Sequence, residues 1–279
     1  MLKRILALQI PSTAAEPKKN FDALEEYLCK IFKNSEICPD FLFLPEVWSV
    51  GWYPKCFNDC IDNGETVKFL AKIAKTYNVN VFGGSFIRQT DDGLKNSMPV
   101  ILKDGSLLGY YDKIHLYTPD GEGVLNAGAS PVLFEIEGLK TGVSICYDIR
   151  FPELFRSYSL SVNPPHLLVN LSAWPMTRAL QYSQMAASRA IENQCYFLAL
   201  SQCGEIIEGG GIYNSGGSCV YDSMGNLISK LDKNFGYIYF TLDTEGVDKT
   251  RLNYPNLKNA KVRDFGFNVK TIFAEGVKC

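Results

Sequence analysis

The chain has 279 residues and a mass of 31.2 kDa, enough for one large domain or two of average size. Hydrophobic residues make up 46% of it and charged residues 21%, as in an ordinary soluble globular protein. The net charge of −2 gives no electrostatic attraction for nucleic acid or an acidic membrane, and no apolar run approaches the roughly 20 residues of a membrane helix. Neither nucleic acid nor a membrane is therefore an expected partner.

The first residues superficially resemble a secretion signal. Lys3 and Arg4 precede an apolar patch, and small residues follow it. The patch is shorter than the roughly 7–15 residues of a signal core, and Gln9 interrupts it, so we interpret it as a buried strand. Without a secretion signal, we expect a cytoplasmic protein.

The cysteine count supports the same compartment. Nine cysteines are an odd number, and a chain of this size needs no disulfides for stability, so we expect mostly free thiols. Cys56 and Cys60 are four residues apart, but no second pair at metal-ligand spacing accompanies them, and the chain has only two histidines. We therefore expect no metal.

Strand-like and helix-like segments alternate in the first part of the chain. Short apolar runs predict strands at residues 4–9, 40–46 and 78–89. Apolar residues at helical spacing predict helices at 17–33 and 64–77. Gly83 and Gly84, within the third strand, indicate a close approach of another backbone.

Hairpins and further helices follow. Asp104-Gly105 between two apolar runs is a strong two-residue turn signal, and Gly138 marks a similar turn. The remaining predicted elements are a helix at 152–161, a strand at 166–173, a helix at 176–193, a strand at 195–203, a hairpin at 218–229 and a strand at 237–242.

This order of elements predicts the fold class. Helices between strands, together with several hairpins, indicate a mixed α/β sheet with helices on its outer faces. About a dozen strands are many for one open sheet, so two sheets packed face to face are expected. No linker or low-complexity segment divides the chain, and we expect a single domain over residues 1–279.

Three chemically capable residue types follow predicted strands, where loops on a rigid scaffold carry function. They are Glu46, Lys113 and Cys146. A buried carboxylate can take the proton of a thiol, and an ammonium can stabilise the oxyanion that forms when a thiolate attacks a carbonyl or nitrile carbon. Glutamate, lysine and cysteine thus suffice for acyl transfer.

Each of these residues also has an ordinary structural explanation. Glu46 after a proline is typical of a solvated turn, Lys113 of a residue facing water, and Cys146 of a core thiol. A dyad of Cys146 with His115 or His166 is a further alternative, and spacing alone leaves it open.

The joint pattern is more specific. LPEVW, YDKIHLY and GVSICYDIRFPEL, in that order, closely resemble the nitrilase superfamily of carbon–nitrogen hydrolases. The resemblance extends over essentially the whole chain and includes SAWPMTRALQYSQMAASRAIENQCYF, SCVYDSMGNLIS and the final RLNYPNLKNAKVRDFG. It implies a four-layer α-β-β-α sandwich, no metal or organic cofactor, and a homodimer or higher homo-oligomer.

The resemblance also implies a role for each motif residue. Glu46 is expected to be the general base, Lys113 the oxyanion stabiliser and Cys146 the nucleophile that forms a thioester. The backbone N–H of Tyr147 is expected to be a second oxyanion donor. Glu122 is the candidate for a second glutamate that orients the lysine and the substrate.

The residues after the cysteine bear on the substrate. CYDIRFP resembles the omega-amidase branch, which releases ammonia from small 2-oxo dicarboxylic monoamides such as 2-oxoglutaramate. Such a substrate needs a cation, for which Arg150 and Arg178 are candidates, while Tyr53 and Trp174 are candidate pocket walls. The alternatives are a repair amidase for deaminated glutathione, a nitrilase, an N-carbamoyl amidohydrolase, and a catalytically idle scaffold.

Overall fold

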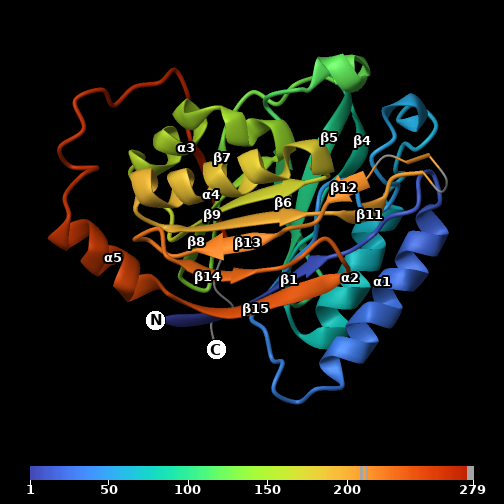
Figure 1. The fold of residues 1–279 in the computed structure, drawn as a ribbon, viewed down its shortest axis with the longest axis horizontal. Helices are drawn as coiled ribbons and strands as arrows, with labels where there is room; N and C mark the ends of the chain where they lie inside the picture. The colour runs from blue at the N-terminus through green and yellow to red at the C-terminus, as the bar shows by residue number, and fades with distance from the viewer. Residues whose placement is uncertain (208–209, 212, 275–279) are drawn as a thin grey trace.

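The computed structural model describes residues 1–207, 210–211 and 213–274. Within them, two seven-stranded sheets lie face to face and helices cover both outer faces, so that four layers follow one another (Figure 1). The expected four-layer sandwich is the observed architecture. No helix in this described part is both long and apolar enough to cross a membrane.

The first sheet contains the N-terminal strands. Its strand order is β15-β1-β2-β3-β5-β4, with β6 paired to β5. Its members are β1 (Leu2–Gln9), β2 (Phe41–Phe43), β3 (Asn80–Phe82), β4 (Phe86–Thr90), β5 (Gly93–Ile101), β6 (Leu107–Asp112) and β15 (Gly236–Asp243). Helices α1 (Pro17–Phe32) and α2 (Glu65–Tyr77) cover its outer face (Figure 1).

The second sheet has the order β14-β13-β10-β9-β8-β7-β16. Its members are β7 (Val132–Ile136), β8 (Leu139–Ile145), β9 (Leu167–Ser172), β10 (Tyr196–Ser201), β13 (Cys219–Tyr221), β14 (Leu227–Lys230) and β16 (Lys270–Phe273). Helices α3 (Pro152–Ser159) and α4 (Ala179–Asn193) cover it, α5 (Thr244–Asn253) follows β15, and a small ribbon joins β11 (Cys203–Glu205) to β12 (Tyr213–Ser215).

Period-two alternation in the strands explains the layering. In β1, Ile5 and Ala7 pack into the core between the sheets, while Leu6 and Leu8 pack against the helix layer. A strand that is apolar on both faces belongs in the middle of such a sandwich, which explains why β1 reads as one continuous hydrophobic run.

Most predicted elements are confirmed within a few residues, but two predicted strands are wrong in extent. Residues 78–89 form β3 and β4 rather than one strand. The break falls at Gly84, which has a φ of +67° and whose added Cβ would lie 2.2 Å from the Pro45 carbonyl oxygen. The predicted close approach at this glycine is therefore confirmed, and it interrupts the strand.

The predicted strand 195–203 also divides, into β10 and β11. At Cys203 the backbone N–H turns away from the second sheet and donates to the Ile10 carbonyl at 3.1 Å. The helix predicted at 176–193 begins with a 3-10 turn, Met176–Arg178, before α4 starts. Helix α5 was not predicted.

Candidate active site

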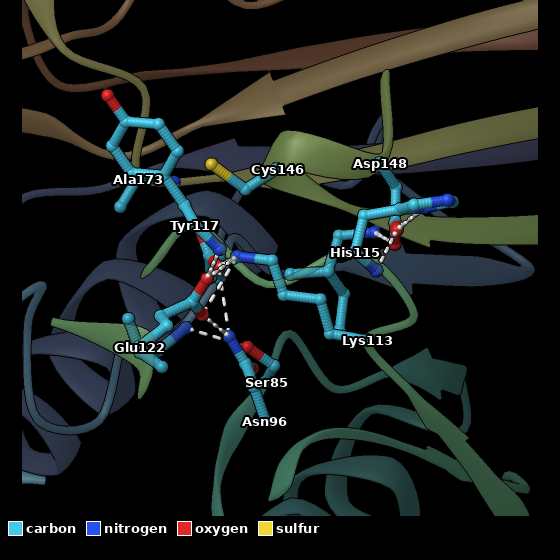
Figure 2. Close-up of polar contacts among 12 residues, drawn as sticks. Ser85, Asn96, Lys113, His115, Tyr117, Glu122, Cys146, Asp148 and Ala173 are labelled. Carbon is cyan, nitrogen blue, oxygen red and sulfur yellow. Dashed lines mark hydrogen bonds and ion pairs between the residues drawn. The ribbon is translucent and has the colours of Figure 1, made fainter. Parts of the chain in front are cut away.

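Three of the expected site residues lie in loops that follow β2, β6 and β8. Strand β2 ends at Phe43 rather than running to residue 46, which carries Glu46 beyond the edge of the sheet. Lys113 comes directly after β6, and Cys146 directly after β8. In the close-up, the side chains of Lys113 and Cys146 lie near one another and near Glu122 (Figure 2), and an ion pair joins Lys113 to Glu46.

A buried ion cluster forms the floor of this site. Lys113 Nζ lies 3.0 Å from Glu46 Oε1 and 2.9 and 2.8 Å from the two carboxylate oxygens of Glu122. All three side chains are fully buried. The structure therefore brings Glu122 onto the lysine, beside the other expected glutamate.

Three further donors complete the cluster, and one of them is the Tyr117 backbone N–H, which donates to Glu122 Oε2 at 2.6 Å. Asn96 Nδ2 donates to Glu46 Oε1 at 3.0 Å and to Glu122 Oε1 at 3.3 Å. The Ala173 backbone N–H donates to Glu46 Oε2 at 2.9 Å. Both oxygens of Glu46 thus have partners, and the carboxylate is held in one orientation.

Burial and charge act in opposite directions on these groups. Burial alone disfavours the Lys113 ammonium, but Glu122 and Glu46 outweigh it, so the pKa of Lys113 is raised and the amine is charged. Burial raises the pKa of Glu46; Lys113 opposes this shift and Glu122 adds to it. A carboxylate with a raised pKa is a stronger base than an exposed one.

Cys146 occupies a strained position. It begins a short 3-10 helix, Cys146–Arg150, and its φ of +45° lies in the left-handed region that non-glycine residues rarely adopt. Val47, directly after Glu46, has a φ of +38°, which is unusual for a β-branched residue. Strain of this kind persists only where the surroundings impose it, and it gathers at functional sites.

Asp148 imposes the turn at Cys146. Its fully buried carboxylate accepts hydrogen bonds from the Ile145 N–H at 2.9 Å and from the Tyr111 hydroxyl at 2.6 Å. It also accepts from the His115 N–H at 2.9 Å and faces His115 Nδ1 at 2.7 Å. One side chain thus ties the cysteine turn to the loop that carries the lysine (Figure 2).

These contacts bear on the alternative of a cysteine–histidine dyad. Both histidines have other partners: His115 is bound to Asp148, and His166 Nδ1 accepts from the Lys140 N–H at 3.2 Å. After burial, the groups with the largest effect on the pKa of the Cys146 thiol are Glu46, Lys113, Ser172 and Glu122, and neither histidine is among them. The geometry therefore favours a glutamate rather than a histidine as the base.

A cavity of about 820 Å³ opens above the thiol. Cys146 lines it, and so do all the other expected substrate-contact residues, namely Tyr53, Tyr147, Arg150, Trp174 and Arg178. This volume is typical of a site for a small organic ligand. The cysteine thus lies at the boundary between the cavity and the buried ion cluster.

Sequence reasoning missed four contributors to this site. They are the side chain of Asn96, the backbone N–H groups of Ala173 and Tyr117, and Ser172 beside the cysteine. The one signal that the sequence offered for the two side chains is their polarity: Asn96 and Ser172 are polar residues at buried positions of the strands β5 and β9. Elsewhere, Cys56 and Cys60 are free thiols, and no group of three or more potential metal ligands occurs in the part of the chain that the structure describes.

Comparison with known proteins identifies the family. The model for the carbon-nitrogen hydrolase family matches residues 4–252. The chain is 28% identical to a 2-oxoglutaramate amidase of Bacillus subtilis (strain 168) over 254 residues, covering 90% of this chain and 95% of that protein. It is 30% identical to an omega-amidase of Danio rerio over 228 residues, covering 75% and 81% respectively.

The fold comparison agrees. The crystal structure of XC1258 from Xanthomonas campestris, described as a CN-hydrolase superfamily protein, superposes with a TM-score of 0.86 at 24% identity, covering 95% of this chain and all of that one. The chain belongs to the carbon–nitrogen hydrolase family. The predicted family, the predicted fold class and the prediction of a hydrolase are confirmed.

Proposed function

We propose that the protein is a cysteine-dependent amidase that releases ammonia from a small, carboxylate-bearing amide. One observation carries this proposal: the Cys146 thiol lies between an open cavity and a buried cluster of one ammonium and two carboxylates. The thiol faces the substrate side, and the charged groups lie where proton transfer and oxyanion stabilisation are needed. The 2-oxoglutaramate amidase among its relatives supports the substrate class.

In the proposed reaction, Glu46 takes the proton of the Cys146 thiol, and the sulfur attacks the amide carbon. The tetrahedral intermediate carries its negative charge on oxygen. When it collapses, Glu46 returns the proton to the leaving nitrogen, so that ammonia departs and a thioester remains. Glu46 then takes a proton from water, and the resulting hydroxide attacks the thioester. The carbon–sulfur bond breaks, Glu46 returns the proton to the sulfur, and the acid leaves with the Cys146 thiol and the Glu46 carboxylate restored.

Two donors stabilise the oxyanion in this scheme. Lys113 supplies an ammonium that donates hydrogen bonds to both carboxylate oxygens of Glu122. The Tyr147 N–H lies in the first turn of the 3-10 helix, where backbone N–H groups lack intrahelical partners. Because both donors are positioned before substrate binds, little reorganisation is needed as the charge develops.

The charge of the cavity supports a carboxylate on the substrate. Among the described lining residues the charged side chains are Lys55, Arg150 and Arg178, and none is acidic. Arg150 donates to Gln181 Oε1 at 2.9 Å and lies 5.1 Å from the Trp174 ring, but forms no ion pair with a described carboxylate. We therefore assign the substrate carboxylate to Arg150, with Trp174 and Tyr53 as walls.

A second candidate substrate follows from the size of the cavity. About 820 Å³ leaves room beyond a five-carbon monoamide. A longer amide, such as deaminated glutathione, would use that room and present the same carboxylate chemistry. An idle scaffold is disfavoured because the cluster of Glu46, Lys113 and Cys146 is complete.

We also propose a cytoplasmic homodimer or higher homo-oligomer. The cysteines of the described part are all free, which fits a reducing compartment. On α4, the small residues Ala186 and Ala190 are buried in the chain's own core, so they are not available to pack against a second copy. Leu180 and Ile191 on the same helix are 70% and 52% exposed and remain free to contact a second copy.

A substrate panel tests the activity. Ammonia release is measured from 2-oxoglutaramate, deaminated glutathione, simple amides, nitriles and N-carbamoyl compounds, using the parent protein and Cys146→Ala. We expect turnover of a carboxylate-bearing amide by the parent and none by the variant. Mass spectrometry during turnover should also detect an acyl adduct on the cysteine. No turnover of any member, or undiminished turnover by Cys146→Ala, would contradict the proposal.

A further inference from the structure

A buried hydroxyl beside the nucleophile forms no hydrogen bond of ordinary geometry. Ser172 is the last residue of β9 and its side chain is wholly buried; its Oγ meets hydrogen-bond geometry with no described residue, although the Cys146 sulfur and the Tyr182 hydroxyl lie near enough to interact with it. Buried hydroxyls are nearly always paired, because an unpaired one has lost its interactions with water without replacement. A partner that appears only during the reaction would explain this one.

The pairing of the strands places this hydroxyl next to the cysteine. Strands β8 and β9 run parallel, and Ile145 opposite Leu171 is the last pair between them, so Cys146 and Ser172 are the residues that directly follow this pair along the chain. The Ser172 side chain accordingly lies beside the Cys146 sulfur, and also beside the Tyr182 hydroxyl. Since the Tyr182 hydroxyl donates to the Asn170 carbonyl at 3.0 Å, it is already satisfied as a donor.

We propose that Ser172 is a further catalytic residue, whose hydroxyl donates a hydrogen bond to the Cys146 sulfur once the thiol has lost its proton. This inference rests on Cys146 being the nucleophile of the proposed function. A neutral thiol is a weak acceptor and a thiolate is a strong one, so the bond strengthens as the reactive form appears. The serine keeps its own proton, and the thiol proton goes to Glu46.

The surrounding charges show why such a donor is useful. Burial and the Glu46 carboxylate both raise the pKa of the Cys146 thiol. Lys113 and Ser172 act in the opposite direction. Because Lys113 is already shared between two carboxylates, the Ser172 hydroxyl supplies stabilisation that is specific to the thiolate.

Alkylation with iodoacetamide tests this directly, because it reports thiolate reactivity without requiring turnover. Trypsin releases Cys146 in the peptide TGVSICYDIR, which contains no other cysteine, so its modification is followed separately by mass spectrometry. A hydrogen bond to a charged group is worth about tenfold or more in equilibrium. In Ser172→Ala we expect alkylation of this peptide at neutral pH to slow about tenfold, with its pH midpoint raised by about one unit.

Ser159→Ala is the matched control. Ser159 in α3 is also buried with an unpaired hydroxyl, but it lies outside the site, so its removal should leave the alkylation rate unchanged. Both variants should be at least as stable as the parent in urea, because each loses only an unpaired buried hydroxyl. A general structural role for Ser172 predicts the opposite, namely lower stability with no change in the pH midpoint.

Two results would overturn the proposal. An unchanged alkylation rate and midpoint in Ser172→Ala would mean that the hydroxyl points to Tyr182 rather than to the sulfur. Failure of Ser172→Ala to fold would mean that the hydroxyl has a structural partner. Neither result depends on the substrate panel. If the parent protein shows no amidase activity, the proposed function fails; if Ser172→Ala leaves the reactivity of the Cys146 thiolate unchanged, only the proposal for Ser172 fails.

Discussion

Two buried carboxylate clusters lie at the same end of the sandwich and differ in the charge of their partners. Glu46 and Glu122 share the ammonium of Lys113, so that cluster is ionic. Asp148 instead accepts hydrogen bonds from two backbone N–H groups, from the Tyr111 hydroxyl and from His115. The first cluster can move protons and stabilise charge, whereas the second holds two loops in register.

The comparison shows how one fold separates chemistry from positioning. In the ionic cluster, the charges of Lys113 and Glu122 set the pKa of Glu46, so any change in the net charge of the cluster alters that pKa. A carboxylate among mostly neutral donors fixes geometry, because each bond has a direction. Variants of the two clusters should therefore differ in their pH profiles as well as in their rates.

The largest effect is expected from Lys113→Met. It removes the proposed oxyanion donor and leaves two buried carboxylates without their shared cation. We expect turnover to fall about 10³-fold or more, and the free energy of unfolding to fall by about 3–5 kcal/mol. Ammonia release and urea denaturation measure the two quantities.

An exposed ion pair provides the control for that variant. Lys72 is 60% exposed and lies 2.7 Å from Glu25, so Lys72→Met should change stability by no more than about 1 kcal/mol and leave turnover unchanged. Parental turnover in Lys113→Met would contradict the role of the ionic cluster.

A smaller effect, but a more specific one, is expected from Glu122→Gln. Activity requires the Glu46 carboxylate in its charged form, so kcat/KM of the parent should fall as the pH drops through the raised pKa of Glu46. Because the negative charge of Glu122 contributes to that raised pKa, its removal should move the acid limb of kcat/KM to lower pH. Lys113 also loses a positioning partner, so kcat should fall about 10²-fold.

The pH dependence of kcat/KM measures this shift, with exposed Glu153→Gln as the matched control. A limb that stays in place, or moves to higher pH, would show that Glu122 does not act on Glu46 as the geometry implies.

Local sequence predicted where the proposed reacting groups would lie, because each of them directly follows a strand or a short strand-end turn. Glu46, Lys113 and Cys146 each have an ordinary structural explanation when taken alone, and only the three motifs in their order pointed to one site. Alternation along β1 likewise predicted a buried strand. These features depend on neighbours within a few residues, which a single sequence displays directly.

The parts that sequence could not predict depend on pairing between distant segments. Asn96 meets Glu46 only because β5 lies two strands from β2 in the first sheet. Ser172 meets Cys146 only through the register of β8 and β9. The break at Gly84 arises from the approach of Pro45, about forty positions earlier in the sequence, to its backbone. No propensity or spacing within one segment encodes such contacts.

The smallest effect is expected at the positioning cluster, from Asp148→Asn. Asparagine keeps the size of the side chain but presents an NH₂ group where Asp148 accepts from a donor, so at least one buried hydrogen bond is lost. We expect kcat to fall about tenfold and the free energy of unfolding by about 1–3 kcal/mol. Because Asp148 acts on the position of Cys146 and not on the charge at Glu46, the acid limb of kcat/KM should stay where it is in the parent.

Tyr111→Phe removes one donor to the same carboxylate and should show a weaker form of the same loss. An acid limb displaced in Asp148→Asn as in Glu122→Gln would mean that the two clusters titrate together, and the division between chemistry and positioning would fail.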